Sequence, residues 1–369
     1  MQDTFVAHPF LSVTLGILVY FIGAFLTRSV RFLRDFSIPE PVSGGLAIAV
    51  VVWLWRAATG SEIVFELAVR DYLLVIFFAC IGLNARIADL IVGGKRLAVL
   101  LALTIGFMVL QNGVGVIGAG AFGLPGEVGV LLGTASLIGG HGTAIAWGPT
   151  IEAETGFAAA AEIGVAAATL GLILAAVLCG PIAKWLIERN RLSSDQGADD
   201  IVGLSNDEPG AEEAITHVSL MRAMLAAHVA VIIGWILNGV IADLGLKLPL
   251  FVPCLFVGIA MSNTIPLLAP GLPWPARTKA LAVVSDYCLS VFLAMSLMSL
   301  QLWTLASLGG PLITVLLAQA VMTAAFILFV FYRVMGGGYD AAVLSAGFAG
   351  FGLGATPTAI ANMSAVAKR

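Results

Sequence analysis

The stretch "GGHGTAIAW", residues 139–147, decides how this chain folds. It lies in an apolar region where a membrane-spanning helix is expected, yet three of its first four residues are glycine. A glycine inside a helix costs up to about 1 kcal/mol relative to alanine. Three glycines in four positions therefore predict a functional break in the backbone.

The composition around this stretch is that of an integral membrane protein. Of the 369 residues, 60% are hydrophobic and 11% are charged, and the mean hydropathy is +1.03, whereas soluble domains are about 45–50% apolar and about 25% charged. Because lipid cannot satisfy backbone polar groups, long apolar runs must be helices. We predict an all-α polytopic membrane protein with helices near 10–27, 42–56, 72–90, 97–120, 157–186, 219–243, 248–262, 281–304 and 309–333.

Several other classes of protein are excluded. The net charge is −4 and no long basic cluster is present, which argues against nucleic-acid binding. No HExxH zinc motif or recognisable nucleophile constellation is present, so we do not expect an enzyme. The four cysteines lie far apart in apolar runs and are expected to be small core residues: Cys80, Cys179, Cys254 and Cys288.

Two apolar segments, near 128–146 and near 340–362, contain too many glycines for a good spanning helix, and each is predicted to be a re-entrant hairpin. The distribution of basic residues supports this topology. With the N-terminus outside and both hairpins returning to the side they entered, 15 of the 18 Lys and Arg residues lie on the cytoplasmic side, since only Arg56, Arg70 and Lys247 lie outside. The first hairpin then enters from outside and the second from the cytoplasm.

An acidic, polar stretch divides the chain into two similar halves. Residues 192–217 are predicted to be a flexible cytoplasmic linker between the repeats 1–191 and 218–369. "DYLLVIFFA" from Asp71 matches "DYCLSVFLA" from Asp286, and "TAIA" recurs from Thr143 to Thr358, both at an offset of 215. Both aspartates are expected at helix starts. Five crossings precede the second copy, so the repeats are inverted.

Inverted repeats around broken helices are typical of secondary transporters, with the substrate site near the midplane. Half-helix N-termini offer N–H groups to a carboxylate, and freed carbonyls can coordinate Na⁺. The candidate substrate residues are Gly139, Gly140, His141, Gly142 and Thr143 in the first hairpin, and Gly354, Thr356, Thr358 and Asn362 in the second. The candidate Na⁺ ligands are Asn84, Asn112, Glu162 and Thr356.

Structural roles remain open for several of these candidates. His141 can contact substrate or a proton, or it can be a structural imidazole. Each threonine can instead bond a carbonyl of its own helix. Glu162 can bind Na⁺ or the substrate ammonium, or it can serve the start of its helix.

Five ordered motifs resemble the sodium/glutamate symporter family of bacteria. They are "IPEPVSGGL" at 38–46, "RDYLLVIFFACIGLN" at 70–84, "GGHGT" at 139–143, "YDAAVLSAG" at 339–347 and "GFGLGATPTAIANM" at 350–363. The resemblance implies an inner-membrane homodimer with two inverted five-helix halves and two hairpins, which takes up L-glutamate with Na⁺. Members continue with a tenth helix that is missing from this sequence, which stops at Arg369.

The leading hypothesis is alternating access, in which a transport unit carries the hairpins past a scaffold in an elevator-like movement. One alternative is a Na⁺-coupled carrier of di- or tricarboxylates, because 2-hydroxycarboxylate transporters are similar, more distantly. Another is a channel that conducts ions passively through the same vestibule.

Overall fold

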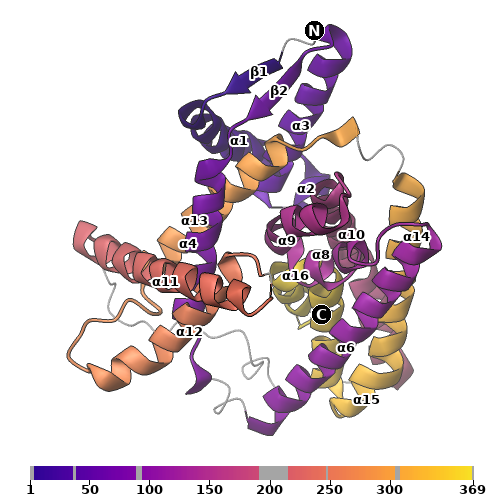
Figure 1. Cartoon of the computed structure of the whole chain (residues 1–369). Coiled ribbons are helices and arrows are strands. Elements are labelled where there is room, and N and C mark those ends of the chain that lie inside the picture. The colour runs from indigo at the N-terminus through magenta and orange to yellow at the C-terminus, as the bar shows by residue number, and fades with distance from the viewer. Residues whose placement is uncertain are drawn as a thin grey trace. The chain divides into compact units, whose positions relative to one another are not determined.

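The computed structural model describes residues 4–35, 39–88, 94–190, 215–246, 248–303 and 308–367. Within this part of the chain all nine predicted helices are present (Figure 1). They are α1 (Pro9–Ser29), α3 (Glu40–Thr59), α4 (Ala68–Asn84), α6 (Gly94–Ala121), α10 (Ala160–Asn190), α11 (His217–Asp243), α12 (Phe251–Leu268), α13 (Lys279–Met298) and α14 (Gly309–Phe326). The last continues through the π-helix η3 (Ile327–Phe331) and α15 (Tyr332–Val334), and a short α2 (Arg31–Asp35) follows α1.

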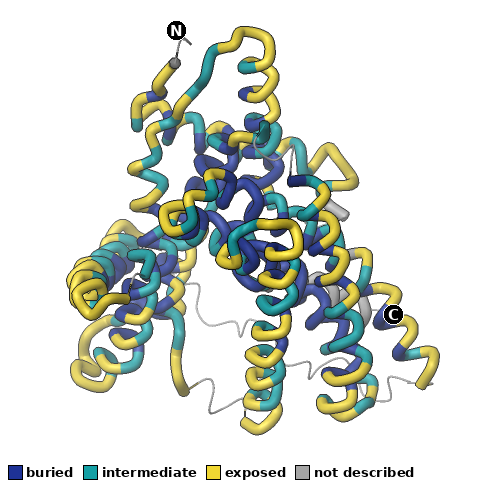
Figure 2. The backbone as a smooth tube through the Cα atoms, turned by 45° about the vertical axis from the view of Figure 1, so that its right-hand side comes forward, coloured by how far each residue is buried: buried dark blue, intermediate teal, exposed yellow. Residues whose placement is uncertain are grey.

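The helices have the length and surface of membrane spans. Among the described residues, eight helices are long and apolar enough to cross a membrane. Many large apolar side chains on them are exposed, such as Val109 on α6 and Trp235 on α11, at 69% and 66%. Figure 2 shows long stretches of exposed residues along the helices. A soluble monomer rarely exposes so much apolar surface. The prediction of a helical, multi-pass membrane protein is therefore confirmed.

The all-α prediction missed one small element of β structure. Strands β1 (Thr4–Ala7) and β2 (Glu62–Phe65) pair in parallel, with Thr4 opposite Glu62 and Ala7 opposite Phe65. Each strand adjoins a long helix and carries backbone groups that need hydrogen-bond partners. The pairing supplies those partners at the ends of α1 and α3.

The chain forms two compact units, and each draws on both halves of the sequence. Unit 1 comprises Met1–Phe25, Glu40–Gly94 and Asp207–Ser299, and unit 2 comprises Leu26–Pro39, Lys95–Asn206 and Leu300–Arg369. Unit 1 therefore contains most of α1, together with α3, α4 and α11 to α13, and unit 2 contains the end of α1 and the other helices. Most of the predicted linker 192–217 lies outside the described residues.

Glycines set the helix packing in unit 1. α4 packs on α12, where a β-carbon at Gly258 would lie 3.0 Å from Gly82 Cα. α13 packs on α3, where Gly45 faces Leu297. Small residues allow helix backbones to approach closely, which drives helix association in lipid.

The structure supports one of the two predicted aspartate roles and corrects the other. Asp71 lies in the first turn of α4, where its Oδ1 accepts from Arg70 at 2.6 Å. Asp286 does not open a helix, because α13 begins at Lys279 and Thr278 caps it. The apolar run already placed the start of this helix near residue 281, ahead of the aspartate, and the structure begins it two residues earlier.

Candidate functional site

The first glycine-rich segment is broken, as predicted. It comprises α7 (Val128–Leu131), α8 (Thr134–Leu137) and α9 (Gly140–Thr155). Gly140 has a φ of +71°, in the left-handed region that favours glycine. A β-carbon on Gly139 would lie 2.6 Å from the carbonyl oxygen of Ala135. These two glycines are therefore required by the backbone at the break.

The chain reverses direction at this break. A β-carbon on Gly164 of α10 would lie 3.2 Å from both Leu131 Cδ2 and Ala144 Cβ. In a straight helix, two residues 13 positions apart (144 − 131) would be separated by about 20 Å. α7 and α9 therefore lie close together against α10.

The second segment differs from the prediction in its local structure. Residues 339–367 are helical throughout, as α16 (Tyr339–Ala367), so its glycines do not interrupt the helical backbone. A β-carbon on Gly347 would nevertheless lie 2.5 Å from Met363 Cγ, although 16 residues (363 − 347) span about 24 Å in a straight helix. α16 therefore bends back on itself, and Pro357 inside it removes a backbone donor near the centre of the bend.

The two reversals meet on α10. A β-carbon on Gly171 would lie 2.7 Å from Leu137 Cδ2, at the end of α8, and would overlap the carbonyl oxygen of Leu353 in α16. Leu137 and Leu353 belong to one buried cluster. Figure 1 shows α8, α9, α10 and α16 gathered together within unit 2.

Two buried glutamines on the long helices form hydrogen bonds with these segments. Each donates to a carbonyl in the other half of the chain. Gln111 Nε2, on α6, donates to the carbonyl of Gly352 in α16 at 2.7 Å. Gln319 Nε2, on α14, donates to the carbonyls of Leu132 at 3.0 Å and Gln111 at 2.8 Å. Because the amide nitrogens face carbonyls, the side-chain orientations are defined. Both Oε1 atoms are buried and accept no hydrogen bond within the described part of the chain.

Gln319 was not among the sequence candidates. It is a lone amide in the apolar run "VLLAQAVM" of α14. A polar side chain inside a spanning segment was the signal that could have identified it.

Asn112 holds the start of α8. Its Oδ1 accepts from Thr134 N at 3.0 Å and from Thr134 Oγ1 at 2.8 Å. A carbonyl oxygen has two lone pairs, and both have donors here. The structure thus gives Asn112 a positioning role at the start of α8, and its coordination of Na⁺ stays a prediction.

His141 occupies a structural position within the candidate site. It is buried, and its Nε2 lies 2.9 Å from Thr169 Oγ1 on α10. The Thr169 hydroxyl donates its one hydrogen to the carbonyl of Val165. His141 Nε2 must therefore carry the hydrogen that Thr169 accepts. The imidazole fixes the beginning of α9 to α10.

The other residues at this break are only partly buried. Thr143 Oγ1 donates to the carbonyl of Gly139 at 3.1 Å. In this structure the threonine therefore bonds a backbone carbonyl four residues before it. Gly139 is exposed, and Gly140 and Gly142 are half-buried. No side chain caps the N-terminus of α9. Its first N–H groups, with the positive end of the helix dipole, are suited to bind an anion.

Two other Na⁺ candidates have hydrogen-bond donors of their own. Glu162 is buried at the start of α10, where its Oε1 accepts from Gln301 N at 3.3 Å. It lies seven residues before Thr169, which is about 10 Å along the helix. Asn84 belongs to unit 1, where its Oδ1 accepts from Arg277 N at 2.9 Å. Arg277 has a φ of +62°, so this bond holds an unfavourable backbone conformation.

The second segment contributes less described detail. Gly354 is buried near the bend of α16. The side chains of Thr356, Thr358 and Asn362 lie outside those that the structure describes. Among the described residues, no group of three or more His, Cys, Asp or Glu could hold a metal ion. Oxygen atoms of the backbone, of amides and of hydroxyls are the remaining ligands at this site, and they suit a hard cation.

Comparisons with known proteins show which family this chain belongs to. The family model described as "Sodium/glutamate symporter" matches residues 8–369. The sodium/glutamate symporter of Escherichia coli (strain K12) is 39% identical over 352 residues, covering 95% of this chain and 87% of that protein. The sodium/glutamate symporter of Haemophilus influenzae is 38% identical over 371 residues, covering 100% and 91%.

The matches span nearly the full length of this chain and of its relatives, and they include both folded-back segments and the helices that hold them. The chain belongs to the sodium/glutamate symporter family.

Proposed function

We propose that this protein is a secondary active transporter that couples the entry of Na⁺ to the uptake of L-glutamate. The observation that carries the proposal is the meeting of two folded-back segments on α10, at Leu137, Gly171 and Leu353. Backbone that departs from a straight spanning helix survives at membrane depth only where protein or a water-filled cavity surrounds it. Relatives named sodium/glutamate symporters support the choice of ion and substrate.

The chemistry of the break fits a small anion and its cation. The uncapped N–H groups of α9 would bind a substrate carboxylate, and the Thr143 hydroxyl would join them by giving up its bond to the Gly139 carbonyl. Na⁺ would take oxygen ligands, and we add Gln111 Oε1 and Gln319 Oε1 to Thr356 because these buried amide oxygens have no donor among the described residues. A buried acceptor without a partner costs about 1–3 kcal/mol, which a bound cation would offset.

The two halves of the sequence are proposed to be inverted repeats with one re-entrant hairpin each. Gly82 of α4 faces Gly258 of α12, and Leu297 of α13, at an offset of 215 (297 − 82), faces Gly45 of α3. Each helix thus packs on the other half's helix. In unit 2, Gln111 in the first half donates to Gly352 in the second half, and Gln319 in the second half donates to Leu132 in the first. This reciprocity supports a pseudo-two-fold relationship.

Transport would follow an elevator-like form of alternating access. Unit 2 contains both folded-back segments, so it would be the transport unit, and unit 1 would be the scaffold. We propose a homodimer in the bacterial inner membrane, with the N-terminus periplasmic and the linker near 192–217 cytoplasmic. The basic-residue distribution supports that orientation.

Uptake of labelled L-glutamate into proteoliposomes tests this function. An inward Na⁺ gradient should drive accumulation above the external concentration, and replacement by K⁺ should abolish it. Citrate and malate are tested as competitors. Na⁺-driven accumulation of labelled citrate without accumulation of glutamate would favour the 2-hydroxycarboxylate alternative, and ion currents without coupled uptake would favour the channel. Absence of Na⁺-dependent accumulation of any of these anions would contradict the proposal.

A further inference from the structure

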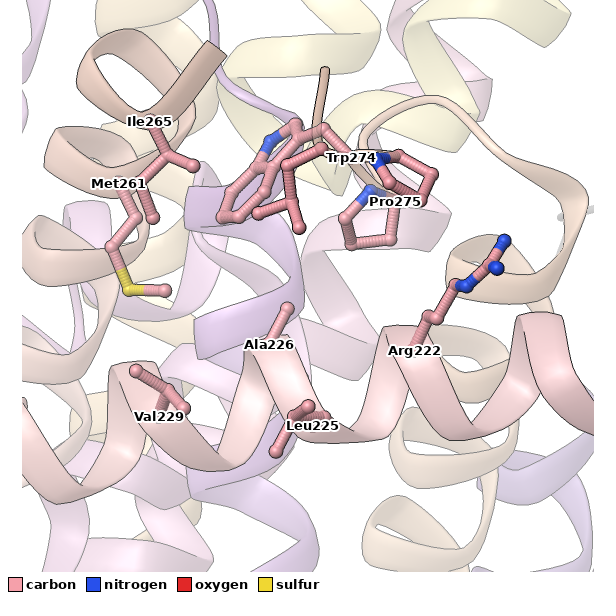
Figure 3. Close-up of a pocket in the computed structure, with 10 residues that line it drawn as sticks. Arg222, Leu225, Ala226, Val229, Met261, Ile265, Trp274 and Pro275 are labelled. Carbon is pink, nitrogen blue, oxygen red and sulfur yellow. The ribbon is translucent and has the colours of Figure 1, made fainter. Parts of the chain in front are cut away.

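Unit 1 contains a cavity that has no part in the proposed transport site. Its volume is about 260 Å³, and it lies between α11, α12 and the loop that follows α12 (Figure 3). The lining comprises Arg222, Leu225, Ala226, Val229, Met261, Ile265, Leu272, Pro273, Trp274 and Pro275. Nine of these ten residues are apolar or aromatic, so the interior suits hydrocarbon and not a polar solute.

The cavity has one charged end. Arg222, Ala226 and Val229 follow one face of α11 at helical spacing. From Arg222 to Val229 the face extends about 10 Å along the helix axis. The charge therefore lies at the end of the cavity that is nearer the start of α11, and the apolar lining continues from it toward the middle of the helix (Figure 3).

Arg222 is available to a ligand. It is exposed, and within the described chain it forms no ion pair; the pairs present there join Arg56 to Glu62, Arg70 to Asp71, and Lys184 to Glu188. α11 is one of the helices that can cross a membrane, and Arg222 is its sixth residue. An arginine so close to the end of a spanning helix lies at the depth of lipid headgroups.

Apolar surface surrounds the opening of the cavity. Leu225 and Leu272, which line it, are 66% and 54% exposed, and Leu267 and Leu268 at the end of α12 are 80% and 84% exposed. Trp274, in the loop that follows α12, has an amphipathic ring of the kind that favours the membrane–water interface. The cavity therefore opens toward the acyl region, with its single cation at the headgroup level.

We propose that this cavity is a binding site for an anionic phospholipid. Arg222 pairs with the headgroup phosphate, and part of one acyl chain enters between α11 and α12. A zwitterionic phospholipid offers the same phosphate and chain, but its own headgroup cation competes with Arg222 for the phosphate, so the site favours a headgroup with net negative charge. Basic pockets between spanning helices on one side of a membrane commonly hold anionic lipids in this manner. The inference does not depend on the transported substrate.

Native mass spectrometry of the full-length protein tests the proposal. The protein is released from detergent after exchange with phosphatidylglycerol or with phosphatidylcholine of the same acyl chains. We expect one phosphatidylglycerol to be retained per protomer in preference to phosphatidylcholine. Arg222→Gln should reduce that preference about fivefold, the effect of one cation near a membrane surface. Arg333→Gln, which removes an exposed arginine that does not line the cavity, should leave it unchanged.

A second variant tests the binding of the acyl chain independently of the binding of the headgroup. Ala226→Phe fills the cavity and should reduce retention of both lipids, with folding checked by circular dichroism. If Ala226→Phe does not fold, Arg222→Gln and its control decide alone. Equal retention of the two lipids by the wild type, or an unchanged preference in Arg222→Gln, would overturn the proposal. Displacement of the lipid by inorganic phosphate alone, or a change of oligomeric state in Ala226→Phe, would also contradict it, in favour of an anion site or of a contact between copies.

Discussion

The amide nitrogen of Gln319 donates hydrogen bonds to two carbonyl oxygens, those of Leu132 and Gln111, both in the first half of the chain. Substitution by leucine keeps the volume but leaves both carbonyls without this donor. The expected loss of unfolding free energy is about 1–3 kcal/mol, with a corresponding loss of glutamate uptake. Thermal unfolding in detergent measures the first, and proteoliposome uptake the second.

Thr104→Val provides the matched control for Gln319→Leu. It also removes a hydrogen bond from a long helix, but that bond joins Thr104 Oγ1 to Leu100 O within α6. Its effect should stay within about 0.5 kcal/mol. Equal effects of the two substitutions would show that Gln319 does not hold the first folded-back segment.

At Gly140, the left-handed φ of +71° predicts a specific sensitivity. Gly140→Ala should cost about 1–2 kcal/mol and impair transport, because an L residue is strained in this conformation. Gly113→Ala, in the open interior of α6, has no atom within 4 Å of the new methyl group and should stabilise the protein by up to about 1 kcal/mol. Transport in Gly140→Ala at the wild-type rate would contradict the role of the break.

For His141, the contact with Thr169 predicts rescue by a donor. His141→Gln can place an amide N–H where the imidazole Nε2–H lies, whereas His141→Leu cannot. Glutamine should therefore retain most of the uptake and thermal stability, and leucine should lose both. If both variants fold equally well and neither transports, His141 instead acts on substrate or on a proton.

At the scale of helices, close packing predicts which glycines cannot be replaced by a larger residue. A β-carbon on Gly82 would overlap the carbonyl oxygen of Leu255 in α12. Gly82→Leu should lower the melting temperature strongly, since overpacking costs about 1–3 kcal/mol or more where backbone cannot yield. Gly239→Leu, on α11 with open space around it, should have little effect. Similar melting temperatures for the two variants would refute the close contact of α4 with α12.

The sequence predicted an element correctly where the residues of that element alone determine its structure. Apolar runs located every spanning helix, because helix formation in lipid depends on local hydropathy. The glycines at 139 and 140 located the first break for the same local reason. Helicity through the bend of α16 was not predicted, since glycine and Pro357 read as interruptions.

The failures concern contacts between distant segments. The β1–β2 pairing joins residues near 4 and 62, and neither strand has an extended run of alternating residues. The sequence also did not predict that the Asn112 oxygen accepts from Thr134, because that contact depends on the packing of α6 against α8. The importance of Gln319 likewise depends on the carbonyls that the fold brings to it.

At the scale of the molecule, the division into two units predicts alternating exposure of the site. Thr143→Cys, in a protein whose four buried cysteines are replaced by alanine, places a thiol beside the first break. A membrane-impermeant maleimide should label it from either side of the membrane, with the balance shifted by Na⁺ and glutamate. Labelling from one side under all conditions would argue against an elevator-like movement of unit 2.

The account depends on the meeting of the two folded-back segments within unit 2. Leu137→Cys and Leu353→Cys, in the same cysteine-free protein, lie in different halves of the chain but in one buried cluster. With a protease site inserted into the predicted linker, mild oxidation before cleavage should leave the halves joined on a non-reducing gel. The control pair Leu137→Cys and Gly338→Cys should separate. Separation of the Leu137–Leu353 pair, or equal joining of the control, would contradict the site described for this transporter.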